Sequence, residues 1–132
     1  GDLWQRVVDA CCHIRKVLPF DKIIQNYDAQ ISGRKRFQNE VRADLNFFEL
    51  AGAQVKVNPL INWTPEELKT YVSAHDIPPH PLVAKGFASI GCEPCTSPMK
   101  EGEDPRAGRW RNEDKTECGI HFVDGKPVRN GA

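Results

Sequence analysis

The chain has 132 residues, of which 39% are hydrophobic, and this size suits one small domain with a buried core. Its 18 basic residues balance its 18 acidic ones, so no overall field would draw the chain to nucleic acid or to a membrane surface. No stretch approaches the roughly 20 apolar residues that span a bilayer, and the N-terminal sequence lacks the regions of a secretory signal. We therefore expect a cytoplasmic protein with no nucleic-acid or membrane partner.

The first predicted elements are two helices and a strand. An amphipathic helix that ends near a cysteine pair is predicted by apolar residues at spacings of three and four, namely Leu3, Trp4, Val7, Val8 and Cys11. A second, short helix is predicted after Pro19, through the sequence FDKIIQNYD. The sequence AQISG then predicts a strand that ends at Gly33.

A basic turn, a second strand and a third helix follow. The turn GRKRFQ, residues 33–38, is the densest positive patch of the chain. The sequence QVKVNPL alternates as a strand does and stops at Pro59. Thr64 and Glu67 form a capping box around a first-turn proline, which predicts a helix to about Ala74. Strands that alternate with helices predict an α/β fold, but two or three strands are too few for a closed sheet, so the domain is expected to be incomplete.

The pattern changes at Ile77. Seven of the ten prolines lie between residues 78 and 127, and hydrophobic periodicity is lost. Long loops in compact domains are usually functional or disordered, and one rich in Cys, Arg and His favours function. We therefore divide the chain into residues 1–76, part of an α/β domain, and residues 77–132, a loop and tail.

Four of the five cysteines form two pairs, Cys11-Cys12 and Cys92-Glu93-Pro94-Cys95. The CxxC spacing lets two thiolates converge on one metal centre. In a reducing compartment, such clusters indicate metal binding or catalysis more often than disulfides. Adjacent cysteines direct both sulfurs at one zinc ion with difficulty, whereas a cubane offers each sulfur its own iron. The spacing alone therefore favours a 4Fe-4S cluster, and it leaves a zinc site, a redox disulfide and buried cysteines as alternatives.

Several longer motifs resemble a known family. The motifs are CCHIRKVLP, VKVNPLINWT, HPLVAKGFASIGCEPCT, GEDPRAGRW and KTECGIHF, in this order. They resemble the C-terminal half of the thioredoxin-dependent assimilatory sulfate-nucleotide reductases, and they are most similar to the bacterial adenosine 5′-phosphosulfate (APS) reductases, whose relatives use 3′-phospho-APS (PAPS). The resemblance implies an α/β domain of the PP-loop, adenine nucleotide alpha hydrolase-like type. The SGGKDS-like phosphate loop of that domain is absent, so we expect only its C-terminal part and a long cysteine-bearing tail.

The resemblance also implies a cofactor and a substrate. In the APS-using branch the tandem cysteines and the CxxC bind a 4Fe-4S cluster, whereas the PAPS-using branch typically lacks them. Cys11, Cys12, Cys92 and Cys95 would therefore hold a cluster, and the substrate would be APS. The family cluster is not an obvious electron carrier.

Cys118, in the motif KTECGIH, matches the family nucleophile. It would attack the sulfonyl sulfur of APS, release AMP and form an S-sulfocysteine that reduced thioredoxin, or a glutaredoxin-like reductant, resolves to sulfite in sulfate assimilation and cysteine biosynthesis. Without the resemblance, Cys118 is equally well a buried tail cysteine. Lys115 and His121 would favour its thiolate, whereas Glu117 would oppose it.

The resemblance implies six substrate-binding residues: Lys16, Arg34, Arg36, Arg106, Arg109 and His121. The sulfate and phosphate of APS repel an incoming thiolate, so cations are needed to offset their charge, and guanidinium groups suit oxyanions. Each residue also has an ordinary role as a solvated or packing side chain. Two other functions stay open, a PAPS reductase and a non-catalytic, metal-stapled redox-sensing module. A homo-oligomer is compatible with the sequence.

Overall fold

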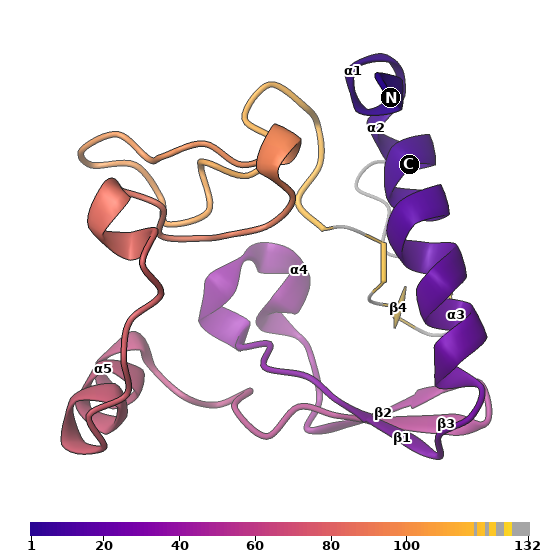
Figure 1. Ribbon diagram of the computed structural model, residues 1–132. Coiled ribbons are helices and arrows are strands. Elements are labelled where there is room, and N and C mark those ends of the chain that lie inside the picture. The colour runs from indigo at the N-terminus through magenta and orange to yellow at the C-terminus, as the bar shows by residue number, and fades with distance from the viewer. Residues whose placement is uncertain (118, 121, 124–125, 128–132) are drawn as a thin grey trace. The chain divides into compact units, whose positions relative to one another are not determined.

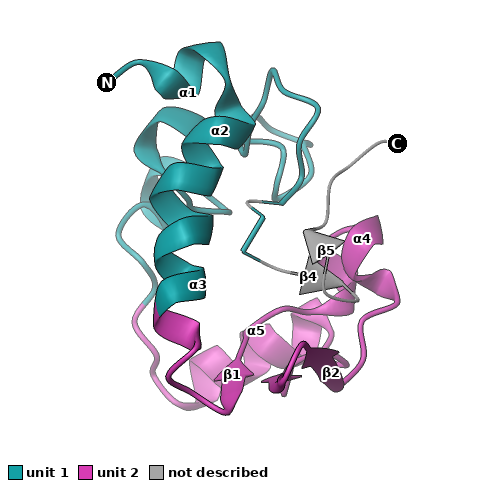
Figure 2. Cartoon of the chain, turned by 90° about the vertical axis from the view of Figure 1, so that its right-hand side faces the viewer, with its two compact units in different colours: residues 1–22, 79–122, 127–132 teal, residues 23–78, 123–126 magenta. Residues whose placement is uncertain are grey.

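The computed structural model describes residues 1–117, 119–120, 122–123 and 126–127 of a mixed α/β chain. The chain divides into two compact units (Figure 2). Unit 1 comprises residues 1–22, 79–122 and 127–132, and unit 2 comprises residues 23–78 and 123–126. The N-terminal helices and the CxxC loop thus belong to one unit although they are far apart in the sequence. The division between residues 76 and 77 stays a prediction about domains.

The N-terminal helical segment does not end at the cysteine pair. Helix α1 (Leu3–Arg6) is separated from α2 (Val8–Cys12) by one extended residue, and a π-helical turn, η1 (His13–Val17), leads directly into α3 (Leu18–Ile24). In η1 the Leu18 N–H donates to the His13 carbonyl, five residues earlier. Helices are thus found in both predicted stretches, but the predicted separation at Pro19 is wrong, and α3 ends at Ile24. Pro19 follows η1 within this continuous segment, although it has no backbone N–H to donate.

Unit 2 contains a three-stranded sheet in the order β1-β3-β2 (Figure 1). Strands β1 (Ala29–Ile31) and β3 (Gln54–Val57) pair in parallel, which confirms both predicted strands. Strand β2 (Phe48–Ala51) pairs antiparallel with β3, and the turn between them uses Gly52 at φ +66°, a conformation that favours glycine. Strand β2 was not predicted.

One face of this sheet is apolar and exposed. The register places on it the side chains of Ala29, Ile31, Phe48, Leu50, Val55 and Val57. Ile31 and Leu50 are 78% and 77% exposed, and Phe48 is 64% exposed. We call this surface the apolar sheet face.

The opposite face carries a buried polar network. Lys56 is 1% exposed, and burial together with the charge of Arg34 lowers the pKa of Lys56 to about 8, although Glu49 opposes the shift. Arg34 donates to Ser32 Oγ and Asn58 Oδ1, each at 3.1 Å, and forms an ion pair with Glu49. The charged face of the sheet is therefore the covered one.

The other elements of unit 2 are short, except for α5. Helix α5 (Pro65–Ala74) confirms the predicted helix, with its capping box: Glu67 N–H donates to Thr64 Oγ1 at 3.2 Å, and Thr64 N–H donates to Glu67 Oε2 at 2.8 Å. The basic turn contains the 3₁₀ turn η2 (Arg36–Gln38), and α4 (Glu40–Ala43), which was not predicted, follows it.

The long loop of unit 1 is built from turns. It contains the 3₁₀ turns η3 (Val83–Lys85) and η4 (Glu93–Cys95), and an isolated bridge pairs Thr96 with Arg109. Near the C-terminus, the two-residue strands β4 (Phe122–Val123) and β5 (Lys126–Pro127) pair with each other. None of the helices in the described part of the chain combines the length and the apolar character needed to cross a membrane.

Two segments of the long loop approach each other closely at Gly108. Ser97 N–H donates to the Gly108 carbonyl at 2.8 Å, and a Cβ added at Gly108 would lie 2.1 Å from the Ser97 carbonyl oxygen. We expect Gly108→Ala to destabilise the fold by about 1–3 kcal/mol, because a backbone carbonyl cannot turn aside as a side chain can. Thermal denaturation measures the effect. Gly33→Ala is the control, because a Cβ there meets nothing within 4 Å; an equal loss in both variants would contradict the steric explanation.

Candidate functional site

The thiols of unit 1 lie within electrostatic range of one another. Burial raises the pKa of Cys95, and the neighbouring Cys92 and Cys11 raise it further, whereas Arg109 and Lys16 oppose the shift. Cys11, Cys92 and Cys95 are half-buried free thiols, and Cys12 is buried. Among the residues that the structure describes, no three His, Cys, Asp or Glu side chains form a group that could hold a metal ion.

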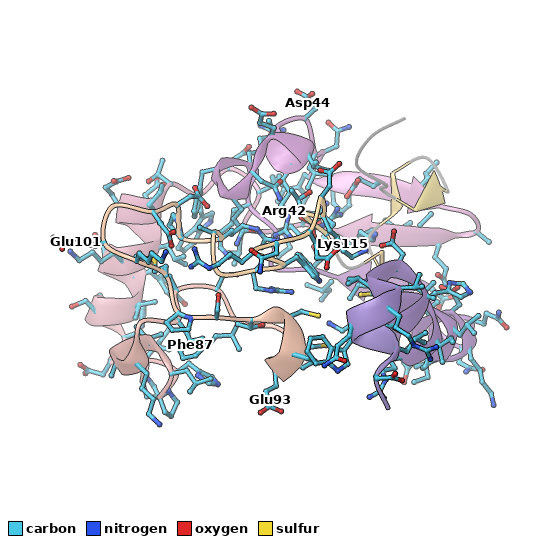
Figure 3. All side chains as sticks on the ribbon, turned by 90° about the horizontal axis from the view of Figure 1, so that it is seen from above. Arg42, Asp44, Phe87, Glu93, Glu101 and Lys115 are labelled. Carbon is cyan, nitrogen blue, oxygen red and sulfur yellow. The ribbon has the colours of Figure 1, made fainter. Side chains whose placement is uncertain are left out.

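The CxxC forms a tight turn because of local hydrogen bonds. Cys95 N–H donates to the Cys92 carbonyl at 3.0 Å, and the Thr96 hydroxyl donates to the same carbonyl at 2.7 Å. Pro94 lies in the first turn of η4, where its fixed φ suits the turn. Glu93 is exposed and points outward (Figure 3). The turn therefore constrains the backbone of both cysteines while its acidic residue faces solvent.

Trp110 connects the arginine-bearing loop to this turn. Its backbone N–H donates to the Cys95 carbonyl at 3.0 Å, and the residue is only 5% exposed. Its φ of +47° lies in the left-handed region, which costs a residue other than glycine about 1–3 kcal/mol. The hydrogen bond and the burial of the indole hold Trp110 in this conformation beside Cys95.

Arg109 occupies a space that Gly91 leaves open. A Cβ at Gly91 would lie 2.3 Å from Arg109 Cζ, so the guanidinium group lies directly over the glycine backbone. Arg109 Nη1 donates to the Ile90 carbonyl at 3.2 Å, and Cζ lies 4.3 Å from the centre of the Trp110 ring. A residue other than glycine at position 91 would displace the guanidinium group.

Two buried donors of this region lack an acceptor. Arg109 Nε and Trp110 Nε1 are both inaccessible to solvent, and neither has a hydrogen-bond partner in the described part of the chain. Buried N–H groups are nearly always hydrogen-bonded in folded proteins, because an unpaired one costs about 1–3 kcal/mol. Both donors belong to the loop that hydrogen-bonds to the CxxC turn, and no acceptor for them is found among the described residues.

Arg106 contacts the segment that precedes Cys118. Its Nη2 donates to the Thr116 carbonyl at 2.7 Å and lies 3.8 Å from Glu117 Oε1. Lys115 of the same segment forms an ion pair with Asp9 of α2, and Lys115 is labelled in Figure 3. From the sequence, Lys115 was expected to favour the thiolate of Cys118. In the structure its ammonium group is paired with Asp9.

The other predicted site residues are distributed over both units. Lys16 is half-buried in η1, in the same unit as the four paired cysteines and Arg109. Arg34 belongs to unit 2 and is 4% exposed within its polar network. Arg36, also in unit 2, donates to the Leu45 carbonyl from Nε at 2.9 Å and from Nη2 at 2.8 Å. Cys118 and His121 lie outside the described residues, and all six substrate-binding assignments stay predictions.

Sequence reasoning missed three participants: Gly91, Trp110 and the pair of Asp9 with Lys115. Gly91 directly precedes the CxxC, and a glycine there was a signal for a close approach of another chain segment. The tryptophan of PRAGRW carried a weaker signal, since an aromatic residue between arginines is a common surface pattern. The pairing of Asp9 with Lys115 had no signal, because 106 residues separate the two.

A cleft of about 410 Å³ borders the CxxC turn within unit 1. Its lining includes Trp4 and Val8 from the N-terminal helices and Cys95, Thr96 and Trp110 from the loop. This volume is within the range of small-molecule sites in proteins. The cleft gives solvent a route to the thiol region.

The parallel strand pair, and the loop that places Arg109 near the thiols, define an α/β protein with a thiol-rich region that also carries cationic side chains. The family model for the phosphoadenosine phosphosulfate reductase domain matches residues 1–98. The chain therefore belongs to this family.

Three curated relatives share the name adenosine 5′-phosphosulfate reductase. The protein from Mesorhizobium japonicum is 50% identical over 122 residues, which are 92% of this chain and 48% of the relative. The protein from Chelativorans sp. is 47% identical over 132 residues, 100% of this chain and 54% of the relative. The protein from Halalkalibacterium halodurans is 48% identical over 124 residues, 92% of this chain and 54% of the relative. The chain thus spans about half the length of these relatives.

A solved structure shares the fold. The crystal structure of phosphoadenylyl-sulfate (PAPS) reductase from Candida auris, in complex with phosphate, matches with a TM-score of 0.62 and 26% sequence identity. The match covers 74% of this chain and 47% of the other. The α/β class expected from the sequence is confirmed by this match and by the family model.

Proposed function

We propose that the protein to which this chain belongs reduces APS to sulfite and AMP, with thioredoxin as the reductant. One observation carries the proposal. In unit 1, the Cys95 thiol lies within electrostatic range of two other thiols and two cations, namely Cys11, Cys92, Lys16 and Arg109. The name shared by relatives that are 47–50% identical supports APS as the substrate. Action in the cytoplasm, in sulfate assimilation and cysteine biosynthesis, is part of this proposal.

The proposed reaction has two steps. The Cys118 thiolate attacks the sulfonyl sulfur of APS; an S–S bond forms, the S–O bond to the nucleotide breaks, and AMP leaves with the electron pair. A thiolate of reduced thioredoxin then attacks Cys118 Sγ and releases sulfite. The second thioredoxin thiol resolves the mixed disulfide, so that thioredoxin becomes oxidised and Cys118 returns to the thiol.

The cationic residues of unit 1 would hold the substrate and offset its charge. Both the sulfate and the phosphate of APS are anions, and they repel the attacking thiolate. Arg106 and Arg109 lie on one loop, and Lys16 lies four residues after Cys12. Their proposed task is to orient the S–O bond for in-line attack. Arg34, Arg36 and His121 remain further candidates for contacts to the nucleotide.

We infer from the spacing of the four paired cysteines and from the family resemblance that the protein holds a 4Fe-4S cluster. Cys11, Cys12, Cys92 and Cys95 would hold it, and the orphaned N–H donors of Arg109 and Trp110 suit sulfur acceptors next to Cys95. When bound, the cluster would contribute free energy to folding, because its four thiolate ligands come from two segments of unit 1. The reaction as written takes its two electrons from thioredoxin and needs none from a cluster.

A product assay with each nucleotide tests the proposed substrate. The family model and the Candida auris enzyme both carry the PAPS name, so PAPS is the second candidate. Four cysteines in two pairs favour APS by resemblance to the branch that holds a cluster. We expect sulfite release from APS with reduced thioredoxin and little from PAPS. The reverse preference would overturn the proposal.

Truncation of either loop arginine is expected to weaken catalysis. Arg106→Ala and Arg109→Ala each remove a charge-assisted contact to an anion, which typically costs about 1.5–3 kcal/mol. We expect kcat/KM for APS to fall about tenfold or more, with the fold retained. Lys85→Ala is a matched control, because Lys85 is an exposed cation on η3 of the same unit. Unchanged kcat/KM in both arginine variants would contradict a contact of these two residues with the substrate.

A further inference from the structure

We propose that Glu117 is a positioning residue, which acts through Arg106 to hold the segment that bears the nucleophile against unit 1. The proposal concerns the residue before Cys118, to which the reaction scheme assigns no role. It rests on the proposed function for the identity of the nucleophile. The contacts that carry it are independent of that function.

A carboxylate at position 117 does not favour ionisation of the neighbouring thiol. Glu117 is nevertheless buried, with 5% of its surface exposed, and it directly precedes Cys118. A carboxylate next to a thiol disfavours the thiolate, and burial strengthens that repulsion. Glu117 therefore opposes the activation of its neighbour, and its burial calls for a different explanation.

Arg106 provides that explanation. Its Nη2 donates to the Thr116 carbonyl at 2.7 Å and lies 3.8 Å from Glu117 Oε1, and the two paired side chains are 17% and 4% exposed. The backbone of Arg106 is itself held in place, because its backbone N–H donates to Asp104 Oδ1 at 2.7 Å. A pair with so little exposure is screened less than a surface pair, so it holds the chain more firmly.

The described neighbours on both sides of Cys118 contact the helical segment of unit 1. Before it, Lys115 forms an ion pair with Asp9 of α2. After it, Gly119 has a φ of +81°, and a Cβ there would lie 3.4 Å from Val17 Cγ2 of η1. Helix α2 ends with the tandem cysteines, and η1 carries Lys16. The contact of Glu117 with Arg106 is thus one of several that hold this segment beside the thiol region.

Arg106 then has two tasks that require the same position. It holds the segment before Cys118, and in the proposed function it contacts the anionic substrate. A guanidinium group can serve both at once, because its five N–H donors form a planar fork. Glu117 would therefore set the distance between nucleophile and substrate through an arginine that they share.

Glu117→Gln in the full-length, cluster-loaded protein tests this role. If the carboxylate positions the segment, amide hydrogen exchange in the peptide that contains Cys118 becomes faster, and the rate of sulfonate transfer from APS to Cys118 falls about tenfold. If the carboxylate acts only by its charge on the thiol, its removal favours the thiolate, so the transfer becomes faster. The two explanations predict opposite signs.

Asp114→Asn is the matched control. Asp114 is an exposed acid four residues before Cys118, and no contact of its side chain is found in the described part of the chain. The same loss of one negative charge should leave both the exchange and the transfer rate unchanged. The peptide 79–90, far from residue 117 in the sequence, reports any general loss of stability.

The outcomes separate this proposal from the proposed function. Unchanged exchange around Cys118 in Glu117→Gln, or equally faster exchange in the reference peptide, would overturn the positioning role. If wild-type protein forms no adduct with APS or PAPS, the proposed function fails, while the exchange result still decides the role of Glu117. Should Glu117→Gln not fold, Glu117→Asp keeps a shorter carboxylate, and intermediate exchange is expected; wild-type exchange in that variant would overturn the proposal.

Discussion

Replacement of Cys118 by serine is expected to abolish sulfite formation and to leave the iron content of the purified protein unchanged. A serine hydroxyl is barely ionised at neutral pH and is a far poorer nucleophile toward sulfur than a thiolate. Cys118 belongs to neither cysteine pair, so a cluster held by the other four would not need it. The measurements are sulfite release with APS and thioredoxin, and iron per chain.

The covalent intermediate gives this prediction its sharpest form. Without thioredoxin, APS should add the mass of one sulfonate group to the full-length protein, and the added mass should map to the peptide that contains Cys118. Reduced thioredoxin should then remove it as sulfite. Turnover by the serine variant, or an adduct on one of the paired cysteines, would contradict the assignment of the nucleophile.

Serine at Cys11, Cys12, Cys92 or Cys95 is expected to lower iron content and thermal stability together. These cysteines come from two segments of unit 1 that are far apart in the sequence, α2 and the CxxC turn. A cluster held by both would join the segments, so its binding free energy would also be folding free energy. The matched control is Cys118→Ser, which removes one thiol without removing a ligand. Full iron retention in all four variants would contradict the assignment of these cysteines as the cluster ligands.

Local sequence signals were sufficient for much of unit 2. The capping box of Thr64 and Glu67 defined α5, because both partners of each hydrogen bond lie within one helical turn. The two parallel strands were found from alternation and from the glycine and proline that end them. Strand β2 was missed, although Phe48, Glu49 and Leu50 alternate in polarity as a half-buried strand does. The strand is only four residues long, and its apolar side chains lie on the exposed face while Glu49 joins the buried polar network.

The candidate site depended on contacts that a sequence pattern does not encode. The prediction of a helix boundary at Pro19 failed because a π-helical turn precedes the proline and lets the helix continue. The arginines of the long loop were found by resemblance, but the position of Arg109 depends on Gly91, and the contacts of Arg106 lie ten residues away, at Thr116. Both arginines are thus positioned by contacts between different turns of the loop.

The apolar sheet face has a thermodynamic consequence for the chain. Covering such a surface is favourable by about 25 cal/mol per Å² of apolar area. Burial of roughly 100 Å² more would therefore add about 2.5 kcal/mol to the stability of the covered form. Ile31, Phe48 and Leu50 leave that free energy unrealised in the structure described above. By mass action, anything that binds the folded face shifts the folding equilibrium. The free energy of unfolding is therefore not a fixed quantity for this chain, since it depends on which apolar surface the sheet meets.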